Sequence, residues 1–242
     1  MRKSARRILS LALLSLNLVG TPGHASVVLD GTRFIYPGAD KEVSVRLTNN
    51  GTQPVVAQAW LDDGDAKGNP SQIRVPFILM PPLARIDANK GQTLRLMYAG
   101  DPLPQDRESV YYLNVLEIPP KPAIKDGGHN LVQVALRSRV KVFYRPAGLK
   151  ADPAQAPAQL NWKLVHEGQH WVLEGANPTP YHVSLTEVTI DGMPDSLGSG
   201  MAAPREMLRF PLAGSPASAT QVHYTAIDDF GATRQQTRPI VR

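Results

Sequence analysis

Apolar and polar residues alternate in short runs from residue 26 to residue 146, and clusters of Gly, Pro, Asn and Asp separate the runs. In "EVSVRLTNNG", residues 42–51, the side chains of Val43, Val45 and Leu47 share one face, and the following Asn-Gly pair is a typical turn. A period of two is the pattern of a half-buried β-strand. Similar runs begin near residues 55, 92, 109 and 131, without a convincing helical period. This spacing predicts an antiparallel β-sandwich.

The strand pattern stops and then resumes in the second half of the chain. Residues 147–159, "AGLKADPAQAPAQ", are rich in Ala and Pro, which is a composition typical of a linker or domain edge. Beyond them about ninety residues again read as short strands, which is enough for one more sandwich. We therefore predict an all-β protein with two sandwich domains, at 26–148 and 149–242.

The first 25 residues have a different pattern. Four basic residues precede the apolar run "ILSLALLSLNLVG", and the small-residue pattern "TPGHA" follows it, with Gly23 and Ala25 at the key positions. This predicts a secretory signal peptide at 1–25 and a mature chain that begins near Ser26. The run is too short for a membrane span, and no later segment approaches the ~20 apolar residues that a span needs. We expect an exported protein that is not membrane-embedded.

Charge and cysteine content narrow the function classes. Removal of the signal peptide lowers the formal net charge from +5 to about +1, so the basic composition does not indicate a nucleic-acid partner. The chain has no cysteine, which excludes the disulfides of many small secreted domains. Stability must therefore come from the size of the core.

One motif imitates a zinc protease. "HEGQH", residues 166–170, matches H-E-x-x-H, in which two histidines on one face of a helix bind the metal. Here Gly168 interrupts the motif and the flanking runs alternate with a period of two, so a hairpin with its tip at 167–169 is the preferred interpretation. The other histidines are isolated, and no phosphate loop, nucleophile elbow or cysteine nucleophile is present. We expect no catalytic residue, no metal and no cofactor.

Longer motifs carry a family resemblance. The segment 104–120, "PQDRESVYYLNVLEIPP", resembles the signature of periplasmic pilus chaperones, the PapD-like family. The resemblance extends in the family's order over nearly the whole mature chain, through "GTRFIYPG", "PFILMPPLARI", "VKVFYRP" and "NPTPYHVSL". It implies two immunoglobulin-like sandwiches set as an L, and no enzymatic activity.

The resemblance also implies partners and a location. Members of the family bind pilin subunits in the periplasm of Gram-negative bacteria, lend a β-strand to each incomplete subunit fold, and pass it to an outer-membrane usher. An alternative from another class is an exported two-domain adhesion or scaffold module without a subunit-folding role. Self-association of the free protein through an exposed strand edge stays open.

By match to the family's motifs, Arg33 and Lys141 hold the carboxylate at the subunit's C-terminus, a role suited to charge-assisted hydrogen bonds. Either residue alone would be read as an ordinary strand cation reaching solvent.

The donor strand implied by the resemblance is "NLVQVALRS", whose alternating apolar residues are Val132, Val134 and Leu136. Alternation alone also allows this row to pack inside the chain's own sandwich. Lys141 has the opposite parity to the row, so a bulge or strong twist between Leu136 and Lys141 is needed if both address one ligand.

The resemblance assigns an interdomain charge cluster as well. Its members are Glu108, Arg145 and Asp229, with Arg85 as a weaker candidate, and the expected role is to fix the angle between the domains. The short segment 121–130 between the signature and the donor strand resembles that of the family's short-loop branch.

Overall fold

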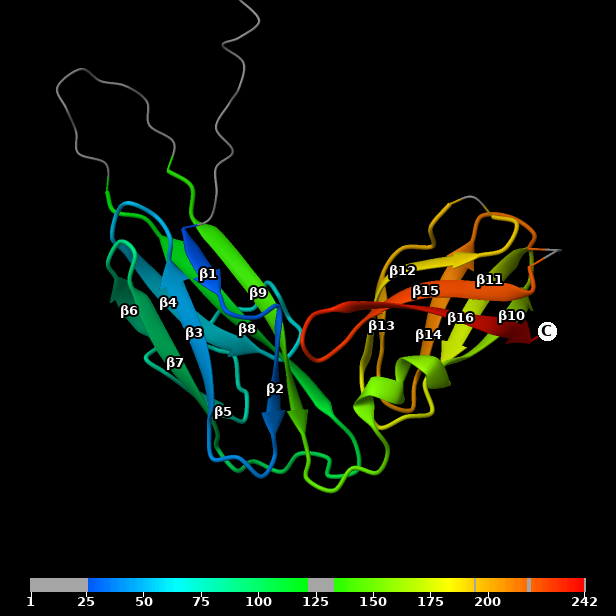
Figure 1. The fold of residues 1–242 in the computed structure, drawn as a ribbon, viewed down its shortest axis with the longest axis horizontal. Coiled ribbons are helices and arrows are strands. Elements are labelled where there is room, and N and C mark those ends of the chain that lie inside the picture. Colours follow the sequence, from blue (N-terminus) through cyan, green and yellow to red (C-terminus); the bar gives the residue numbers. More distant parts are fainter. Residues whose placement is uncertain (1–25, 122–132, 194, 217–218, 242) are drawn as a thin grey trace, which may run out of the picture.

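The structure is a computed structural model that describes residues 26–121, 133–193, 195–216 and 219–241. The predicted signal peptide, 1–25, and Val132 of the predicted donor strand lie outside the described residues. Two β-sandwich domains are set at an angle to each other, with long strands and very little helix (Figure 1). The predicted all-β, two-sandwich fold in an L-shaped arrangement is confirmed.

Two facing sheets build the first domain. One has the order β1-β3-β7-β5 and the other β2-β9-β8-β4-β6. The strand bounds are β1 Val27–Leu29, β2 Arg33–Pro37, β3 Val43–Asn49, β4 Val55–Asp62, β5 Phe77–Met80, β6 Leu83–Ile86, β7 Gly91–Tyr98, β8 Ser109–Ile118 and β9 Leu136–Arg145. The N-terminal part of the chain crosses from one sheet to the other. Its first strand, β1, pairs with β3, whereas β2 pairs in parallel with β9.

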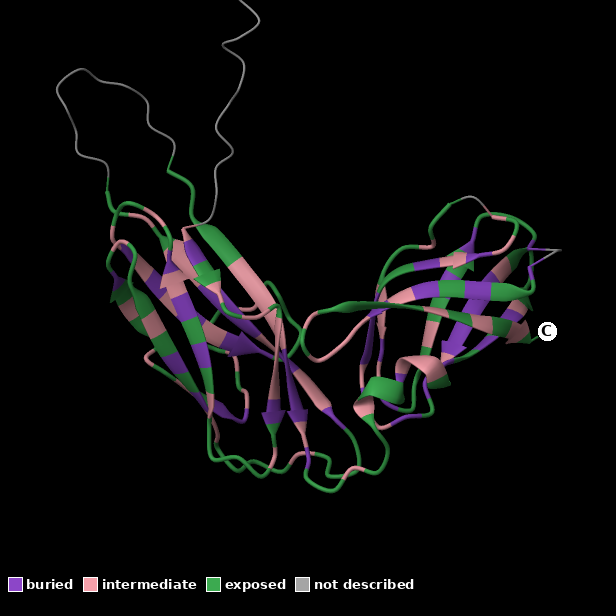
Figure 2. Ribbon diagram, in the orientation of Figure 1, coloured by how far each residue is buried: buried purple, intermediate pink, exposed green. Residues whose placement is uncertain are grey.

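Alternation along these strands fills the first core. Buried and exposed positions follow one another along β3 and β7, as the bands of colour show (Figure 2). Val45, Leu47, Leu96 and Leu113 are fully buried between the two sheets. Each such aliphatic side chain contributes about 1.5–3 kcal/mol when it is withdrawn from water, so the period-two pattern accounts for the sandwich.

In the second domain seven strands are joined by hydrogen bonds in the order β13-β12-β15-β16-β10-β11-β14. Its last strand, β16, pairs antiparallel with β15 and in parallel with β10. The bounds are β10 Asn161–Glu167, β11 His170–Ala176, β12 Val183–Ile190, β13 Gly200–Ala202, β14 Met207–Leu212, β15 Gln221–Ile227 and β16 Thr233–Val241. Trp162 is the largest fully buried side chain of this core.

The Ala- and Pro-rich segment before β10 is more ordered than a linker composition suggests. It forms two short 3-10 helices, η2 (Pro153–Gln155) and η3 (Pro157–Gln159), and the first begins at Asp152, whose side chain accepts a hydrogen bond from the Ala154 amide. Ala156 is buried in the second core. This segment therefore packs as part of the second domain.

The "HEGQH" motif is a β-hairpin. His170 is paired with Glu167 across the antiparallel β10 and β11, and Gly168 takes a φ of +61° at the turn. The ring of His166 packs against Trp171, with 4.6 Å between ring centroids. Within the described ranges, no three His, Asp or Glu side chains are grouped to hold a metal ion.

The pairing of β8 with β9 decides the question of parity. The register runs without interruption from Ser109↔Tyr144 to Glu117↔Leu136, so no bulge separates Leu136 from Lys141. Regular antiparallel pairing keeps successive side chains on alternate faces, so the strand itself does not bring Leu136 and Lys141 to one face. Leu136 shares its face with the core residue Val142, and Lys141 lies on the opposite face.

Candidate functional site

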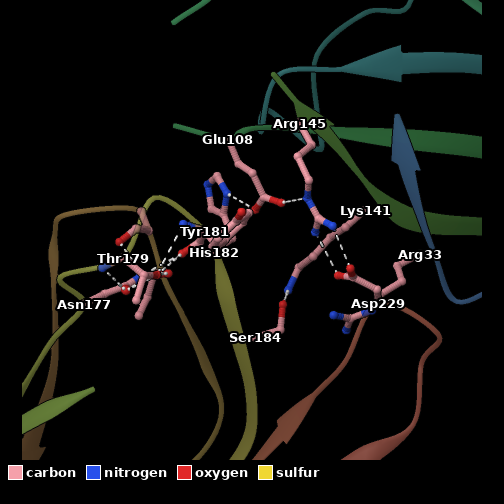
Figure 3. A network of polar contacts seen from close by, with 12 residues as sticks. Arg33, Glu108, Lys141, Arg145, Asn177, Thr179, Tyr181, His182, Ser184 and Asp229 are labelled. Atoms are coloured by element: carbon pink, nitrogen blue, oxygen red, sulfur yellow. Dashed lines mark hydrogen bonds and ion pairs between the residues drawn. The ribbon is translucent and has the colours of Figure 1, made fainter. Parts of the chain in front are cut away.

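Arg33 and Lys141 lie side by side where the two domains meet. They are direct partners in the parallel pairing of β2 and β9. Their strand neighbours Tyr36 and Val142 belong to the first core, so strand parity places both cations on the opposite face, toward the second domain (Figure 3). Residues more than a hundred positions apart thus form one cationic pair.

The described residues of the second domain that accept hydrogen bonds from these two cations are neutral. Lys141 Nζ donates to Ser184 Oγ of β12 at 3.1 Å, and Arg33 Nη1 donates to the backbone oxygen of Ile227 at the end of β15 at 3.0 Å. The Nε of Arg33 is buried without a hydrogen-bond partner. Among the described residues, neither cation has a carboxylate at ion-pair distance.

Burial disfavours both charges. It lowers the pKa of Lys141, and the adjacent charge of Arg33 lowers that pKa further. Burial also lowers the pKa of Arg33, although the negative charges of Asp229 and Asp228 act in the opposite direction. Two neighbouring cations that are partly withdrawn from water, with an unused donor, form a site that an anion would stabilise.

The other cations on this face of β9 are already paired. Arg139 makes two hydrogen bonds to the buried carboxylate of Asp62, and Arg137 lies 3.8 Å from the same group. Arg145 binds two carboxylates, described below. In the part of the chain that the structure covers, Lys141 is therefore the member of this row that lacks a carboxylate.

Glu108, Arg145 and Asp229 meet between the domains. Arg145 Nε donates to Glu108 Oε1 at 2.7 Å, and its two terminal nitrogens donate to the two carboxylate oxygens of Asp229 at 2.7 and 2.9 Å (Figure 3). Asp229 lies in the turn between β15 and β16 of the second domain. Burial lowers the pKa of Arg145, but the hydrogen bonds to Asp229 and the charge of Glu108 outweigh it, and the pKa is raised.

Glu108 also connects the first domain to the segment of the second domain that directly precedes β12. Its Oε2 accepts from the His182 backbone nitrogen at 2.8 Å and lies 3.3 Å from His182 Nδ1, and its own amide donates to Pro180. By contrast, Arg85 is exposed on β6 and pairs with Asp87, so it does not join the cluster. The weaker assignment of Arg85 is wrong.

A cleft of about 220 Å³ lies beside these groups. Its walls come from both domains: Arg33, Phe143 and Arg145 from the first, and Tyr181 and Phe230 from the second. The Arg145 guanidinium lies over the Tyr181 ring, 5.2 Å from its centroid. The candidate anion site therefore borders a preformed interdomain cleft.

Comparison with known proteins identifies the family. A model of the N-terminal domain of PapD, described as a pili and flagellar-assembly chaperone, matches residues 26–150, and a model of the C-terminal domain of the pili assembly chaperone PapD matches residues 155–238. The chain belongs to the PapD family of pilus assembly chaperones. This is a family of folding and assembly chaperones, not of enzymes.

Relatives agree over nearly the full length of the chain. It is 45% identical over 235 residues to the chaperone protein FimB/FhaD of Bordetella pertussis, covering 93% of this chain and 94% of that protein. It is 45% identical over 213 residues to the probable fimbrial chaperone YadV of Escherichia coli, covering 86% and 87%. A crystal structure of the YadV chaperone is 39% identical, with a TM-score of 0.74 over 89% of this chain and all of that one.

A solved complex shows a related chaperone with its subunit. The structure of the Salmonella enterica SafA pilin in complex with the SafB chaperone contains a chain 26% identical to this one, with a TM-score of 0.71, covering 90% of this chain and 98% of that one.

Within the described ranges of the present family member, no helix has the length and apolar character needed to cross a membrane.

The start of β9 in this PapD family member has an unpaired edge. The partner β2 covers only Lys141 to Arg145, so residues 136–140 have β8 on one side and no paired strand on the other within the described residues. Leu136 is 39% exposed and Val134, just before the strand, is 63% exposed. These two apolar side chains are not buried in the chaperone's own core.

Sequence reasoning missed several residues of the site. Ser184 and His182 contact Lys141 and Glu108, and Asp62 neutralises Arg139. A serine or an aspartate in an alternating strand has no distinctive local pattern. The motif "NPTPYHVSL", which contains two of them, was the only signal available.

Proposed function

We propose that this protein is a periplasmic chaperone that binds pilin subunits by donor-strand complementation and anchors their C-terminal carboxylate between Arg33 and Lys141. The observation that carries the proposal is the adjacency of two partly buried cations without a carboxylate partner, next to an open strand edge. The complex of the SafA pilin with the SafB chaperone supports a pilin as the partner.

A carboxylate suits the geometry of the cation pair. Lys141 supplies a mobile ammonium, and Arg33 supplies a planar guanidinium whose Nε is still free. Charge-assisted hydrogen bonds from both groups to one carboxylate are roughly twice as strong as neutral ones. The incoming negative charge would also relieve the repulsion between the two cations.

The open edge of β9 suits an added strand. Residues 136–140 offer free backbone hydrogen-bonding groups, which supply register and affinity in strand addition. The exposed side chains of Val134 and Leu136 would then enter the subunit's groove, and Val132 would extend the row. Lys141 points to the opposite face, so in this proposal it holds the subunit's chain end and takes no part in filling the groove.

Delivery to an outer-membrane usher completes the proposed function, and the periplasm is the compartment that suits a fimbrial chaperone with an N-terminal signal peptide. The glutamate, arginine and aspartate at positions 108, 145 and 229 would set the cleft angle. The same open edge would allow the free protein to self-associate.

Binding of a pilin C-terminal peptide tests the anchor. We expect Arg33→Ala and Lys141→Ala each to weaken binding by about tenfold or more, as loss of one charged hydrogen bond implies. Arg85→Ala is the matched control, because Arg85 is exposed and pairs with Asp87. Undiminished binding in the double variant of Arg33 and Lys141 would instead favour an adhesion or scaffold module.

Co-expression with a pilin tests the donor row. Val134→Ser should leave the stability of the chaperone within about 0.5 kcal/mol, because the side chain is exposed. It should nevertheless reduce recovery of the soluble complex. Ile78→Ser, at a comparably exposed apolar position on β5, is the control. Equal recovery with Val134→Ser and wild type would contradict the assignment of Val134.

A further inference from the structure

The carboxylate of Glu117 receives three hydrogen bonds from the first two described residues. The backbone nitrogens of Ser26 and Val27 donate to its Oε2 at 3.0 and 2.9 Å, and Ser26 Oγ donates to its Oε1 at 2.5 Å. The three donors precede or begin β1, whereas Glu117 lies near the end of β8 in the facing sheet. These contacts therefore bridge the two sheets of the first domain.

Glu117 faces inward at one end of the sandwich. By strand parity it shares its face with the core residues Leu113 and Val115, and it is the register partner of Leu136. Among the described residues, no lysine, arginine or histidine lies at ion-pair distance from it. An inward-facing carboxylate is usually paired with a cation.

The fold holds Ser26 in place independently of Glu117. The Asn50 amide donates to the Ser26 backbone oxygen at 2.7 Å, and Val27 is buried and pairs with Asn49. A side chain at Gly51 would place its Cβ only 2.7 Å from the Ser26 Cβ, so the turn is closely fitted to Ser26. The end of β3 and the turn that follows it thus position the Ser26 nitrogen next to the carboxylate.

We propose that Glu117 is the binding site for the α-ammonium group of Ser26, which removal of the signal peptide creates. A signal peptidase would hydrolyse the Ala25–Ser26 peptide bond with one water molecule. The carbon–nitrogen bond breaks, Ala25 leaves with a carboxylate, and the Ser26 nitrogen takes up a proton to become an ammonium. The nitrogen that donates as an uncharged amide in the unprocessed chain then carries the cation that Glu117 lacks.

Removal of the signal peptide would therefore strengthen the contact between the two sheets of the first domain, at the end where the open edge of β9 begins. A charged ammonium donor adds Coulombic attraction to the hydrogen bond that the uncharged amide already makes to the carboxylate. Since Glu117 is paired with Leu136 on β9, the ion pair would stabilise the start of the strand that carries the donor row. The inference depends on the predicted signal peptide and is independent of pilin binding.

The mature N-terminus is the first test. Intact-mass measurement and N-terminal sequencing of the exported protein should show Ser26 as the first residue. A mature chain that begins at any other residue would overturn the proposal, because its ammonium would not coincide with the nitrogen that faces Glu117.

Neutralising the α-amine is the second test. Cyanate at mildly acidic pH carbamylates the α-amine selectively, because its ordinary pKa of about 7.7–8.0 lies well below that of lysine. Single modification should lower the melting temperature of the wild type and of the exposed control Glu187→Gln by about 2–4 °C. Glu117→Gln should show no such loss. Equal losses in all three proteins would refute the ion pair.

A measurement on the wild type alone covers the case in which Glu117→Gln does not fold. The ion pair keeps the amine protonated, so the α-amine of the native protein should react with cyanate about tenfold more slowly than in urea-unfolded protein, which corresponds to one pKa unit. Equal rates would show that the amine is free.

Discussion

Asp229→Ala should loosen the angle between the two domains without unfolding either one. The substitution removes two hydrogen bonds, at 2.7 and 2.9 Å, between the second domain and the Arg145 guanidinium. Arg145 keeps its bond to Glu108 within the first domain. Asp229 belongs to neither hydrophobic core, so its removal takes no packing from either sandwich.

The size of the effect follows from burial. Breaking a fully buried ion pair costs about 3–5 kcal/mol, whereas an exposed pair contributes about 0–1 kcal/mol. The side chain of Asp229 is 34% exposed and that of Arg145 is 20% exposed, so this pair lies between the two limits. We expect a loss of about 1–2 kcal/mol of interdomain coupling, a factor of roughly 5–30 in the ratio of docked to undocked arrangements.

Spin labels on the two domains provide the assay. Double electron–electron resonance should show a broader interdomain distance distribution in Asp229→Ala, and small-angle scattering should show a larger radius of gyration, while the melting transitions of both domains stay in place. Asp106→Ala is the matched control, because its ion pair with Arg205 also joins the domains but is about half exposed on both sides. An unchanged distribution in Asp229→Ala, or an equal change in the control, would refute the reasoning.

Two further predictions concern stability. Lys141→Met should raise the melting temperature of the free protein at neutral pH by about 2–4 °C, because it removes a cation that burial and Arg33 disfavour. The folded pKa of Lys141 lies below the ordinary 10.5, so the penalty is complete below the folded pKa and disappears as pH rises toward 10.5. The advantage of the variant over wild type should therefore shrink in alkaline melting experiments, and a constant advantage would contradict this cause. Gly175→Ala should destabilise the second domain by about 1–3 kcal/mol in urea unfolding, because its Cβ would lie 2.7 Å from the buried Trp162 ring. Gly214→Ala, which has open space around it, should have little effect.

The case of Lys141 shows how far local pattern reaches. Strand period correctly places Lys141 and Leu136 on opposite faces, because successive side chains alternate in any regular strand. A bulge or strong twist would be needed only if both residues addressed one ligand from one face. The structure allows a different arrangement. The open edge of β9 and the face that carries Leu136 are available to an added strand, and the opposite face carries Lys141.

Local sequence patterns predict much of this protein: the short alternating strands, the two sandwich-sized halves, the hairpin at Gly168 and the motifs that identify the PapD family. These are local properties, because the period of two and the turn residues act over a few neighbours. Match to the family's motifs also predicts Arg33 and Lys141 as site residues, although either one alone resembles an ordinary surface cation.

Which of the charged residues lack an oppositely charged partner depends on the tertiary structure. Arg139 finds Asp62 and Arg145 finds Asp229, yet Lys141 on the same face meets a serine hydroxyl. Likewise Glu117 accepts hydrogen bonds from Ser26 and Val27, which lie 91 and 90 positions away. Strand order and domain docking set these contacts over long sequence distances. The identity of a charged residue therefore does not encode which opposite charge will reach it.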